Sequence, residues 1–267
     1  MNLLVKSRAG REIVRVTRDS ASWSYVGFAA YRVRRGDTLA VAAAPGDEVC
    51  IVVLSGRVSV TAGEQSWRDI GERTSVFQER SPYAVYLPRA NNAAIVAHTD
   101  AEVAVASAPG TGGIAPRLIE PAAMRRFARG EGLNQRFVCD ILPQSDPADH
   151  LLVVEVVTPS GHSSSYPPHK HDTDNLPVES SLEETYYHRL DPPQGFAFQR
   201  VYTDDRSIDQ ALAVEDHDVV MVPRGYHPVV VPYGYTSYYL NVMAGPKREW
   251  HFKNDPAHEW LLSGSKR

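Results

Sequence analysis

Residues 164–172 read Ser-Ser-Tyr-Pro-Pro-His-Lys-His-Asp and contain two histidines separated by one residue, His169 and His171. Side chains alternate between the two faces of a β-strand, so a strand here would place both imidazoles on one face. Two imidazoles at that separation can bind one metal ion when neighbouring strands supply further nitrogen or oxygen ligands. The pair alone is equally typical of two solvated histidines, so the rest of the chain has to decide between these interpretations.

Two later segments carry the residue types that a metal site would need. Residues 183–188 have the pattern of a strand and begin with two adjacent carboxylates, Glu183 and Glu184. Residues 223–228 contain a turn-forming glycine followed by a third histidine, His227. The chain therefore presents a His-x-His pair, a glutamate and a histidine, in that order, each on or beside a strand.

Strand patterns dominate both sides of residues 109–116, Pro-Gly-Thr-Gly-Gly-Ile-Ala-Pro, which interrupt regular structure. Short runs of β-branched and aromatic residues alternate with turn residues, and a helical turn is expected only within residues 121–129. No segment has the long amphipathic periodicity that the helices of an α/β fold would need. We therefore predict an all-β protein with two halves, residues 1–115 and 116–267.

The composition is that of a globular protein, because 43% of the 267 residues are hydrophobic and 22% are charged. The net charge of −4 argues against a nucleic-acid partner, which selects for a basic face. Apolar runs are far shorter than the ~20 residues of a membrane span, and the first residues lack the apolar stretch of a signal peptide. Cys50 and Cys139 are expected to be buried and reduced. The sequence thus predicts a cytoplasmic protein without nucleic-acid or membrane partners.

The order His-x-His, glutamate, histidine resembles the cupin superfamily, whose small barrel, a double-stranded β-helix, binds a metal through these residues. The resemblance implies four ligands, which are His169, His171, Glu184 and His227. Glu184 is preferred to Glu183 because the cupin glutamate stands seven positions before a turn that Asp191 takes here. That register directs Tyr186 and His188 inward together with Glu184.

The earlier half resembles a cupin barrel that has lost its metal site. Residues 47–56 resemble the glutamate-strand-glycine piece and residues 87–92 stand in the place of the second motif, but neither stretch contains a histidine. Nine of the ten histidines lie at or after His150. The resemblance therefore implies two tandem cupin barrels, a bicupin, in which residues 1–115 are a degenerate half and residues 116–267 carry the metal and the active site.

Longer motifs resemble the 5-deoxy-glucuronate isomerases of bacterial myo-inositol catabolism. The matching stretches are residues 129–132 with Arg136, and residues 164–172, 182–189, 199–203, 223–228, 238–246 and 254–260. Residues 161–163, Gly-His-Ser, depart from the family pattern, in which asparagine and tryptophan follow the glycine. If this loop borders the pocket, its contacts with the substrate are expected to differ.

The resemblance implies a metal-dependent aldose–ketose isomerisation of 5-deoxy-D-glucuronate to 2-deoxy-5-keto-D-gluconate. Zinc is the metal that the resemblance favours, and manganese, nickel and iron accept the same ligands. A proton has to leave the carbon that bears a hydroxyl group next to the aldehyde and return to the aldehyde carbon, which requires an acid–base group. We expect this group among Tyr186, His188 and Tyr238 (or its neighbour Tyr239). We expect the substrate carboxylate to bind Arg136, Lys170 or Arg200.

Other functions remain open at this point. They are a related isomerase that acts on 5-keto-4-deoxyuronate, a cupin dioxygenase, and a non-catalytic cupin that binds a sugar acid. All of them predict a small-molecule ligand. A homo-oligomer, with a dimer favoured, is expected because the barrels have antiparallel edges and the earlier half lacks ligands.

Overall fold

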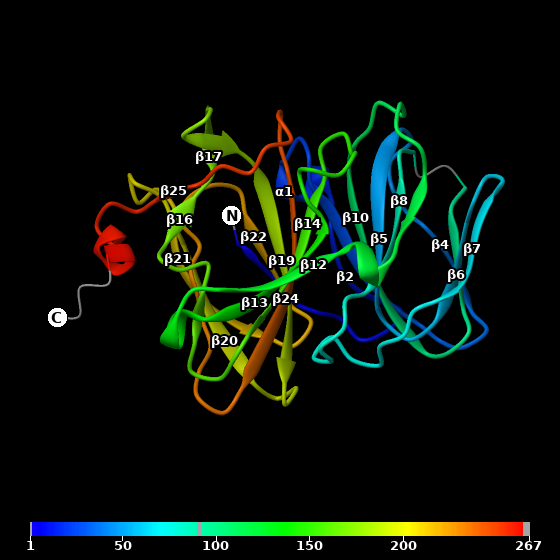
Figure 1. Ribbon diagram of the computed structural model, residues 1–267, viewed down its shortest axis with the longest axis horizontal. Coiled ribbons are helices and arrows are strands. Elements are labelled where there is room, and N and C mark those ends of the chain that lie inside the picture. Colours follow the sequence, from blue (N-terminus) through cyan, green and yellow to red (C-terminus); the bar gives the residue numbers. More distant parts are fainter. Residues whose placement is uncertain (1, 90–91, 264–267) are drawn as a thin grey trace.

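The computed structural model describes residues 2–89 and 92–263 and consists almost entirely of β-strands, which confirms the predicted fold class. Residues 90 and 91, within the 87–92 stretch discussed above, lie outside the described part. The larger sheets follow one another along the long axis of the molecule, with the later half at one end and the earlier half at the other (Figure 1).

The earlier half is built from two sheets. Sheet 1 has the strand order β11 (Arg117–Ile119), β8 (Tyr83–Leu87), β5 (Asp47–Ser55), β10 (Ala101–Pro109), β3 (Gly27–Val33) and β2 (Glu12–Val16). Sheet 2 has the order β4 (Thr38–Ala40), β9 (Ala94–Ala97), β6 (Val58–Ala62) and β7 (Gln65–Ile70). Aliphatic side chains of both sheets fill the space between them, among them Ile51, Val60 and Ile95.

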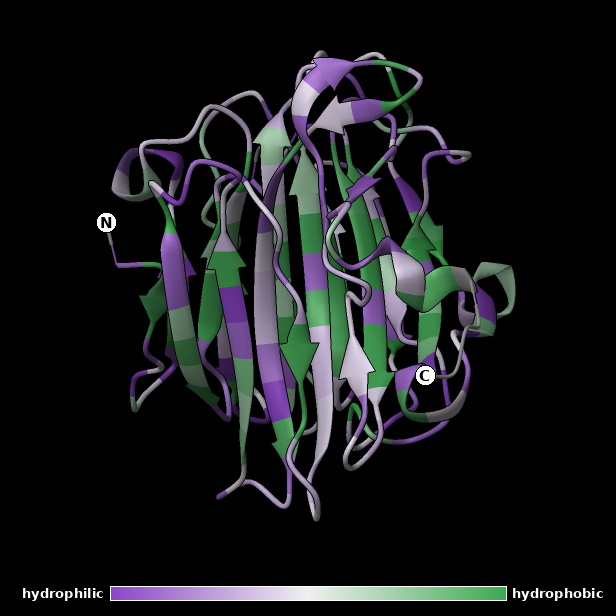
Figure 2. Cartoon of the chain, turned by 90° about the vertical axis from the view of Figure 1, so that its left-hand side faces the viewer, coloured by the Kyte–Doolittle hydropathy of each residue, from purple (hydrophilic) through white to green (hydrophobic). Residues whose placement is uncertain are grey.

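The later half repeats this arrangement. Sheet 3 has the order β1 (Leu4–Val5), β22 (Val219–Val222), β19 (Glu183–Asp191), β24 (Thr236–Ala244), β14 (Leu152–Thr158), β13 (Arg136–Leu142) and β12 (Arg125–Arg129). Sheet 4 has the order β15 (Ser163–Ser164), β23 (Val229–Val230), β20 (Phe196–Tyr202) and β21 (Asp209–Glu215). Hydrophilic bands interrupt the long strands of this half (Figure 2). Its buried residues include Glu184, His188 and Asn241, whereas aliphatic side chains fill the space between sheets 1 and 2.

Short elements complete the fold. Two small ladders pair β16 (His169–Lys170) with β25 (Lys253–Asn254) and β17 (Asp172–Asn175) with β18 (Glu179–Ser181). The helical elements are α1 (Arg18–Ala21), η1 (Pro121–Ala123), η2 (Gly132–Asn134) and η3 (Glu259–Ser263). The turn expected within residues 121–129 is thus confined to η1, and β12 follows it. Among the described residues, no helix has the length and hydrophobicity to cross a bilayer.

Two strand pairings cross the predicted division between residues 115 and 116. Leu4 of β1 pairs with Val220 of β22, so the start of the chain joins a sheet of the later half. Leu118 of β11 pairs with Val85 of β8, so residues after the division join a sheet of the earlier half. The two halves therefore exchange edge strands, which a boundary drawn from turn residues does not anticipate.

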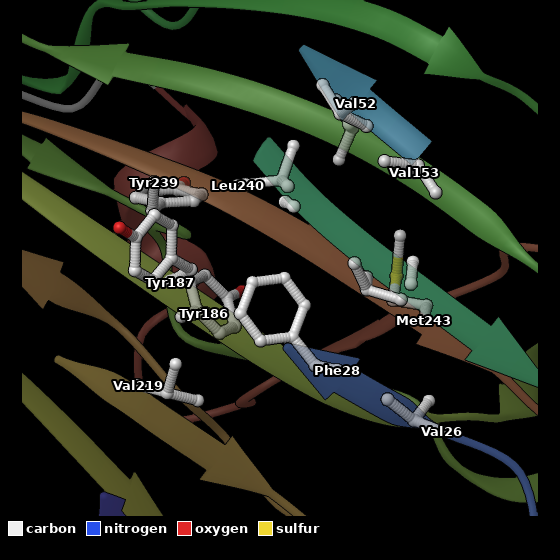
Figure 3. Packing of buried hydrophobic residues seen from close by; sticks show 14 of the residues in the cluster. Val26, Phe28, Val52, Val153, Tyr186, Tyr187, Val219, Tyr239, Leu240 and Met243 are labelled. Carbon is white, nitrogen blue, oxygen red and sulfur yellow. The ribbon is translucent and has the colours of Figure 1, made fainter. Parts of the chain in front are cut away.

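Sheets 1 and 3 pack face to face and share one apolar core. The rings of Phe28 in β3 and Tyr187 in β19 lie 5.5 Å apart, and the same cluster contains Val52 of β5 and Val153 of β14 (Figure 3). Cys50 and Cys139 are buried free thiols in this core, as predicted. Burial of apolar surface stabilises a fold by about 25 cal/mol per Å², so this continuous core holds the halves together.

The sheet orders reveal which strands of the two halves are equivalent. β5 lies between β8 and β10, and β19 lies between β22 and β24. Glu48 of β5 pairs with Ala108, and Glu183 of β19 pairs with Ala244, so these two glutamates occupy the same place. The next residue faces the barrel interior, and it is Val49 in the earlier half where the later half has Glu184.

Glu48 and Glu183 form reciprocal clamps between the halves. Glu48 accepts hydrogen bonds from the backbone N–H groups of residues 149–151 at 2.6 to 2.8 Å. Glu183 accepts from the backbone N–H groups of residues 24–26 at 2.7 to 2.9 Å. Hydrogen bonds to a carboxylate are the stronger kind, so each half fixes the loop that leads into a central strand of the other.

The variants Glu48→Ala and Glu183→Ala each leave backbone N–H groups without an acceptor, at a cost of about 1–3 kcal/mol per buried group. We therefore expect each variant to lower the free energy of unfolding by about 3 kcal/mol or more, measured by urea unfolding. The exposed Glu64→Ala is the control, with an expected change of at most about 0.5 kcal/mol. Unchanged stability of Glu183→Ala would contradict the clamp.

Candidate metal centre

Three side chains from separate segments converge inside the later barrel. Nε2 of His171, which follows β16, lies 3.1 Å from Oε2 of Glu184 in β19. Nε2 of His227, which lies between β22 and β23, is 3.2 Å from the same oxygen. All three residues are buried, and their ligand atoms lie within 4.8 Å of one another. Among the described residues this is the only such group of histidine, cysteine and acidic side chains.

The donor atoms of this group fit a divalent cation. The two Nε2 atoms and Oε2 of Glu184 are buried and have no hydrogen-bond partner within the described part of the chain. An unsatisfied buried polar atom costs about 1–3 kcal/mol of stability. Three such atoms directed at one centre therefore indicate a binding site for a cation. Imidazole nitrogen and carboxylate oxygen are the ligands that zinc and similar metals take in proteins.

The surroundings keep Glu184 ionised. Burial by itself raises the pKa of this carboxyl group, but His227, His171 and a hydrogen bond from Asn241 outweigh burial and lower the pKa to about 2. Burial, with the neighbouring His227 and His171, holds the pKa of His169 well below its usual value. The centre therefore combines an anionic carboxylate with the imidazoles of His171 and His227.

Residues behind the group orient His227. Its Nδ1 lies 2.8 Å from the carbonyl oxygen of Gly225, which leaves Nε2 directed at the centre. The N–H of Gly225 donates to Oδ2 of Asp172 at 2.9 Å, and the other oxygen of Asp172 accepts from Lys170 at 2.8 Å. Asp172 thus ties the His-x-His segment to the turn that carries His227, as outer-shell partners do around metal ligands.

A small cavity lies beside this group. Its volume is about 30 Å³, room for about two water molecules. The polar side chains that line it include Arg129, Arg136, His169, Tyr186 and Tyr239. Phenol hydroxyls, positive charge and a candidate metal-binding group therefore lie together.

The whole chain matches one family of proteins. Residues 3–261 fit the model of the KduI/IolB family. This chain belongs to the KduI/IolB family. The family resemblance seen in the sequence motifs is thereby confirmed.

Relatives of this KduI/IolB protein carry the name of an enzyme. The chain is 52% identical to a 5-deoxy-glucuronate isomerase of Geobacillus kaustophilus over 263 residues, which covers 97% of this chain and 95% of the relative. It is also 52% identical to the 5-deoxy-glucuronate isomerase of Bacillus subtilis strain 168 over 248 residues, covering 92% and 91%.

Solved structures support the fold. The crystal structure of an IolB-like protein from Salmonella typhimurium LT2 superposes with a TM-score of 0.95 at 48% identity, covering 98% of this chain and all of that chain. The oxalate decarboxylase of Lactobacillus farciminis superposes with a TM-score of 0.64 at 12% identity, covering 99% and 91%, a likeness of fold alone. The predicted cupin architecture is confirmed.

Of the four predicted ligands in this KduI/IolB protein, His169 lies beside the group and not within it. Its ring centroid is 5.0 Å from that of His227 and 6.4 Å from that of His171. Phe252 packs on the other side of the ring, with centroids 4.6 Å apart. Glu183, the alternative carboxylate, faces the interface between the halves, so Glu184 is the glutamate that faces the centre.

The predicted acid–base residues separate into two sets. Tyr186 lines the cavity, with its hydroxyl 3.1 Å from that of Ser165. His188 lies on the same face, where Nε2 meets Gln199 at 2.9 Å and burial lowers the pKa to about 4. Tyr238 is a wrong prediction, because it faces the interface between the halves and donates to Glu155 at 3.0 Å.

Two of the three predicted carboxylate-binding residues lie elsewhere. Arg136 lines the cavity, and its binding of a carboxylate stays a prediction. Lys170 points away from its flanking histidines and pairs with Asp172 and Asp204 at 2.8 and 3.0 Å, because side chains alternate along a strand. Arg200 lies on the exposed face of β20 and pairs with Asp209 at 2.8 Å. Both predictions are therefore wrong.

Several cavity residues were missed by the sequence analysis. Asn241 shares one face of β24 with Tyr239, which was expected only as the alternative to Tyr238, and strand alternation could have linked them once the inward face was known. Arg129 lies in a motif already noted for the family resemblance. Trp250 belongs to an irregular segment with no pattern that marks it.

His162 lies in the divergent loop of residues 161–163. Its Nδ1 is directed at the carbonyl oxygen of Gln135, at 2.8 Å.

The turn that carries His227 requires glycine at position 225. Its φ is +95°, and a Cβ would lie 2.4 Å from the carbonyl oxygen of Tyr202. Gly234 is a matched control because its φ is +94° but no atom lies within 4 Å of such a Cβ. We expect Gly234→Ala to cost about 1 kcal/mol of stability and Gly225→Ala about 2 kcal/mol more, measured by urea unfolding. Equal losses would contradict this role.

Proposed function

We propose that this chain is a metal-dependent aldose–ketose isomerase that converts 5-deoxy-D-glucuronate to 2-deoxy-5-keto-D-gluconate in myo-inositol degradation. The observation that carries the proposal is the convergence of His171, Glu184 and His227 beside a cavity lined by tyrosine and arginine. The names of the relatives support the same reaction. Location in the cytoplasm and assembly into a homo-oligomer remain predictions from the sequence.

His171, Glu184 and His227 would hold the cation, and His169, which lies beside this group, is the fourth ligand that the family resemblance implies. Zinc is the metal favoured by the family resemblance, and manganese, nickel and iron accept these donors. When bound, a divalent cation polarises the carbonyl oxygen and the adjacent hydroxyl oxygen of a sugar and supplies several kcal/mol of stabilisation to the negative charge that develops there. Glu184, ionised before the ion binds, also offsets part of its charge.

The reaction removes a proton from the carbon that bears a hydroxyl group next to the aldehyde and returns it to the aldehyde carbon. Tyr186 and Tyr239 line the cavity with ring centroids 4.8 Å apart. Burial raises the pKa of both phenols, and the charge of Arg136 opposes this rise for Tyr239. Both phenols thus line the cavity in which the proton would move, and we propose Tyr239 for the proton transfer and Tyr186 as a hydrogen-bond donor.

The variant His171→Ala tests the cation site. We expect loss of bound metal, measured by elemental analysis of the purified protein. Turnover of 5-deoxy-D-glucuronate should fall about 1,000-fold, which corresponds to about 4 kcal/mol of lost stabilisation. The partly exposed His258→Ala is the control and should retain both properties. Full metal stoichiometry in folded His171→Ala would contradict the ligand assignment, and a metal-loaded wild-type protein without turnover would contradict the function.

The variants Tyr239→Phe and Tyr238→Phe compare the contributions to catalysis of two neighbouring residues on opposite faces of β24. Loss of an acid–base group typically costs about 100- to 10,000-fold in rate, so we expect a fall of this size in kcat for Tyr239→Phe. Tyr238→Phe removes a hydrogen bond at the interface and should change kcat only a few-fold. Incorporation of deuterium from D₂O into the product reports the proton transfer directly. Equal turnover of the two variants would refute the role of Tyr239.

A further inference from the structure

Two arginines face each other at one side of the cavity. Arg129 at the end of β12 is directly opposite Arg136 at the start of β13. Like charges directly opposite on neighbouring strands destabilise a sheet. Burial, together with the charge of Arg129, lowers the pKa of Arg136. The arrangement therefore costs stability in the absence of a negatively charged partner.

The nearest partners of both guanidinium groups are uncharged, and the carboxylate of Asp140 acts on Arg129 only from beyond ion-pair distance. Arg136 donates to the carbonyl oxygen of Asn134 at 2.9 Å and to its side-chain oxygen at 3.1 Å. The guanidinium carbon of Arg129 lies 5.8 Å from the ring centroid of Trp250 and 5.7 Å from that of Phe252. Within residues 2–89 and 92–263, no carboxylate oxygen lies within 4.0 Å of a nitrogen of either arginine. In the described part of the chain, the two arginines beside the cavity thus have no ion-pair partner.

The backbone between the two arginines is shaped to hold them. Gly130 has a φ of +80°, and a Cβ there would lie 2.2 Å from the carbonyl oxygen of Asn134 and 2.7 Å from Nη1 of Arg136. The turn therefore packs closely behind Arg136. Both arginines line the same cavity as His169 and Asn241, next to the candidate metal centre.

We propose that Arg129 and Arg136 together bind the carboxylate of the substrate and fix which end of the molecule faces the candidate metal centre. This inference rests on the proposed function and adds Arg129 as a specificity-determining residue. A guanidinium group recognises a carboxylate through parallel hydrogen bonds. A neutral sugar leaves both charges unpaired, and sites with unpaired polar groups reject such analogues strongly.

Binding of D-glucuronate and D-glucose to the metal-loaded protein, measured by calorimetry, tests the pairing. These sugars differ by the carboxylate alone, so wild-type protein should bind D-glucuronate at least about 100-fold more tightly. Arg129→Gln should weaken that binding about 10- to 100-fold and raise KM more than it lowers kcat, with metal content unchanged. Arg129→Lys should recover part of the loss, because the charge remains without the planar fork. Arg126→Gln is the matched control, an exposed arginine of the same strand on the opposite face.

Three outcomes would overturn the proposal. They are equal binding of the two sugars by wild-type protein, unchanged discrimination in a folded and metal-loaded Arg129→Gln variant, and inorganic phosphate binding as tightly as D-glucuronate in an Arg129-dependent way. A failure of the isomerase assay is a separate result. If wild-type protein does not isomerise the substrate but Arg129→Gln still loses D-glucuronate binding, the proposed function fails and the carboxylate site stands.

Discussion

An ionised carboxylate buried between two imidazoles organises the later barrel. Glu184 is 1% exposed, and an isolated charge at such depth is strongly unfavourable, so its neighbours have to compensate it. His171 and His227 approach one of its oxygens, and Asn241 donates to the other. A shift of β19 by one residue against its neighbours would turn Glu184 out of the barrel. The centre therefore fixes the strand register as well as the chemistry.

The two adjacent glutamates of β19 have different roles, one in the interface between the halves and one at the candidate metal centre. Glu183 faces the interface and holds the backbone of the earlier half, whereas Glu184 faces the barrel interior. In the equivalent strand β5, Glu48 keeps the first role, but Val49 takes the inward place and is fully buried. The glutamate clamp is thus the same in both directions, and the residue after it is charged in the polar barrel and aliphatic in the apolar one.

Much of the site could be predicted from the sequence, because its ligand types follow one another at motif spacing and strand alternation places Tyr186 and His188 with Glu184. The choice between Tyr238 and Tyr239 could not be predicted, because β24 is covered on both faces and almost all its residues are buried. Such a strand has no polar–apolar alternation that marks its inward face. The exposed position of Arg200 could have been predicted, because exposed and buried residues alternate along β20.

The edge-strand exchange and the cavity wall depend on contacts between residues far apart in the sequence, which no local pattern encodes. Arg73 of the earlier half is 2% exposed and binds both oxygens of Glu155 in β14, at 3.0 and 2.9 Å. Tyr238 donates to the same carboxylate. Glu155 and Tyr238 each stand directly before a residue that lines the cavity. These cavity residues are Val156 and Tyr239. Removing one member of a buried ion pair is strongly destabilising because the other charge stays buried. The earlier half, although its own interior is apolar, therefore sets the position of the wall against which the substrate would lie.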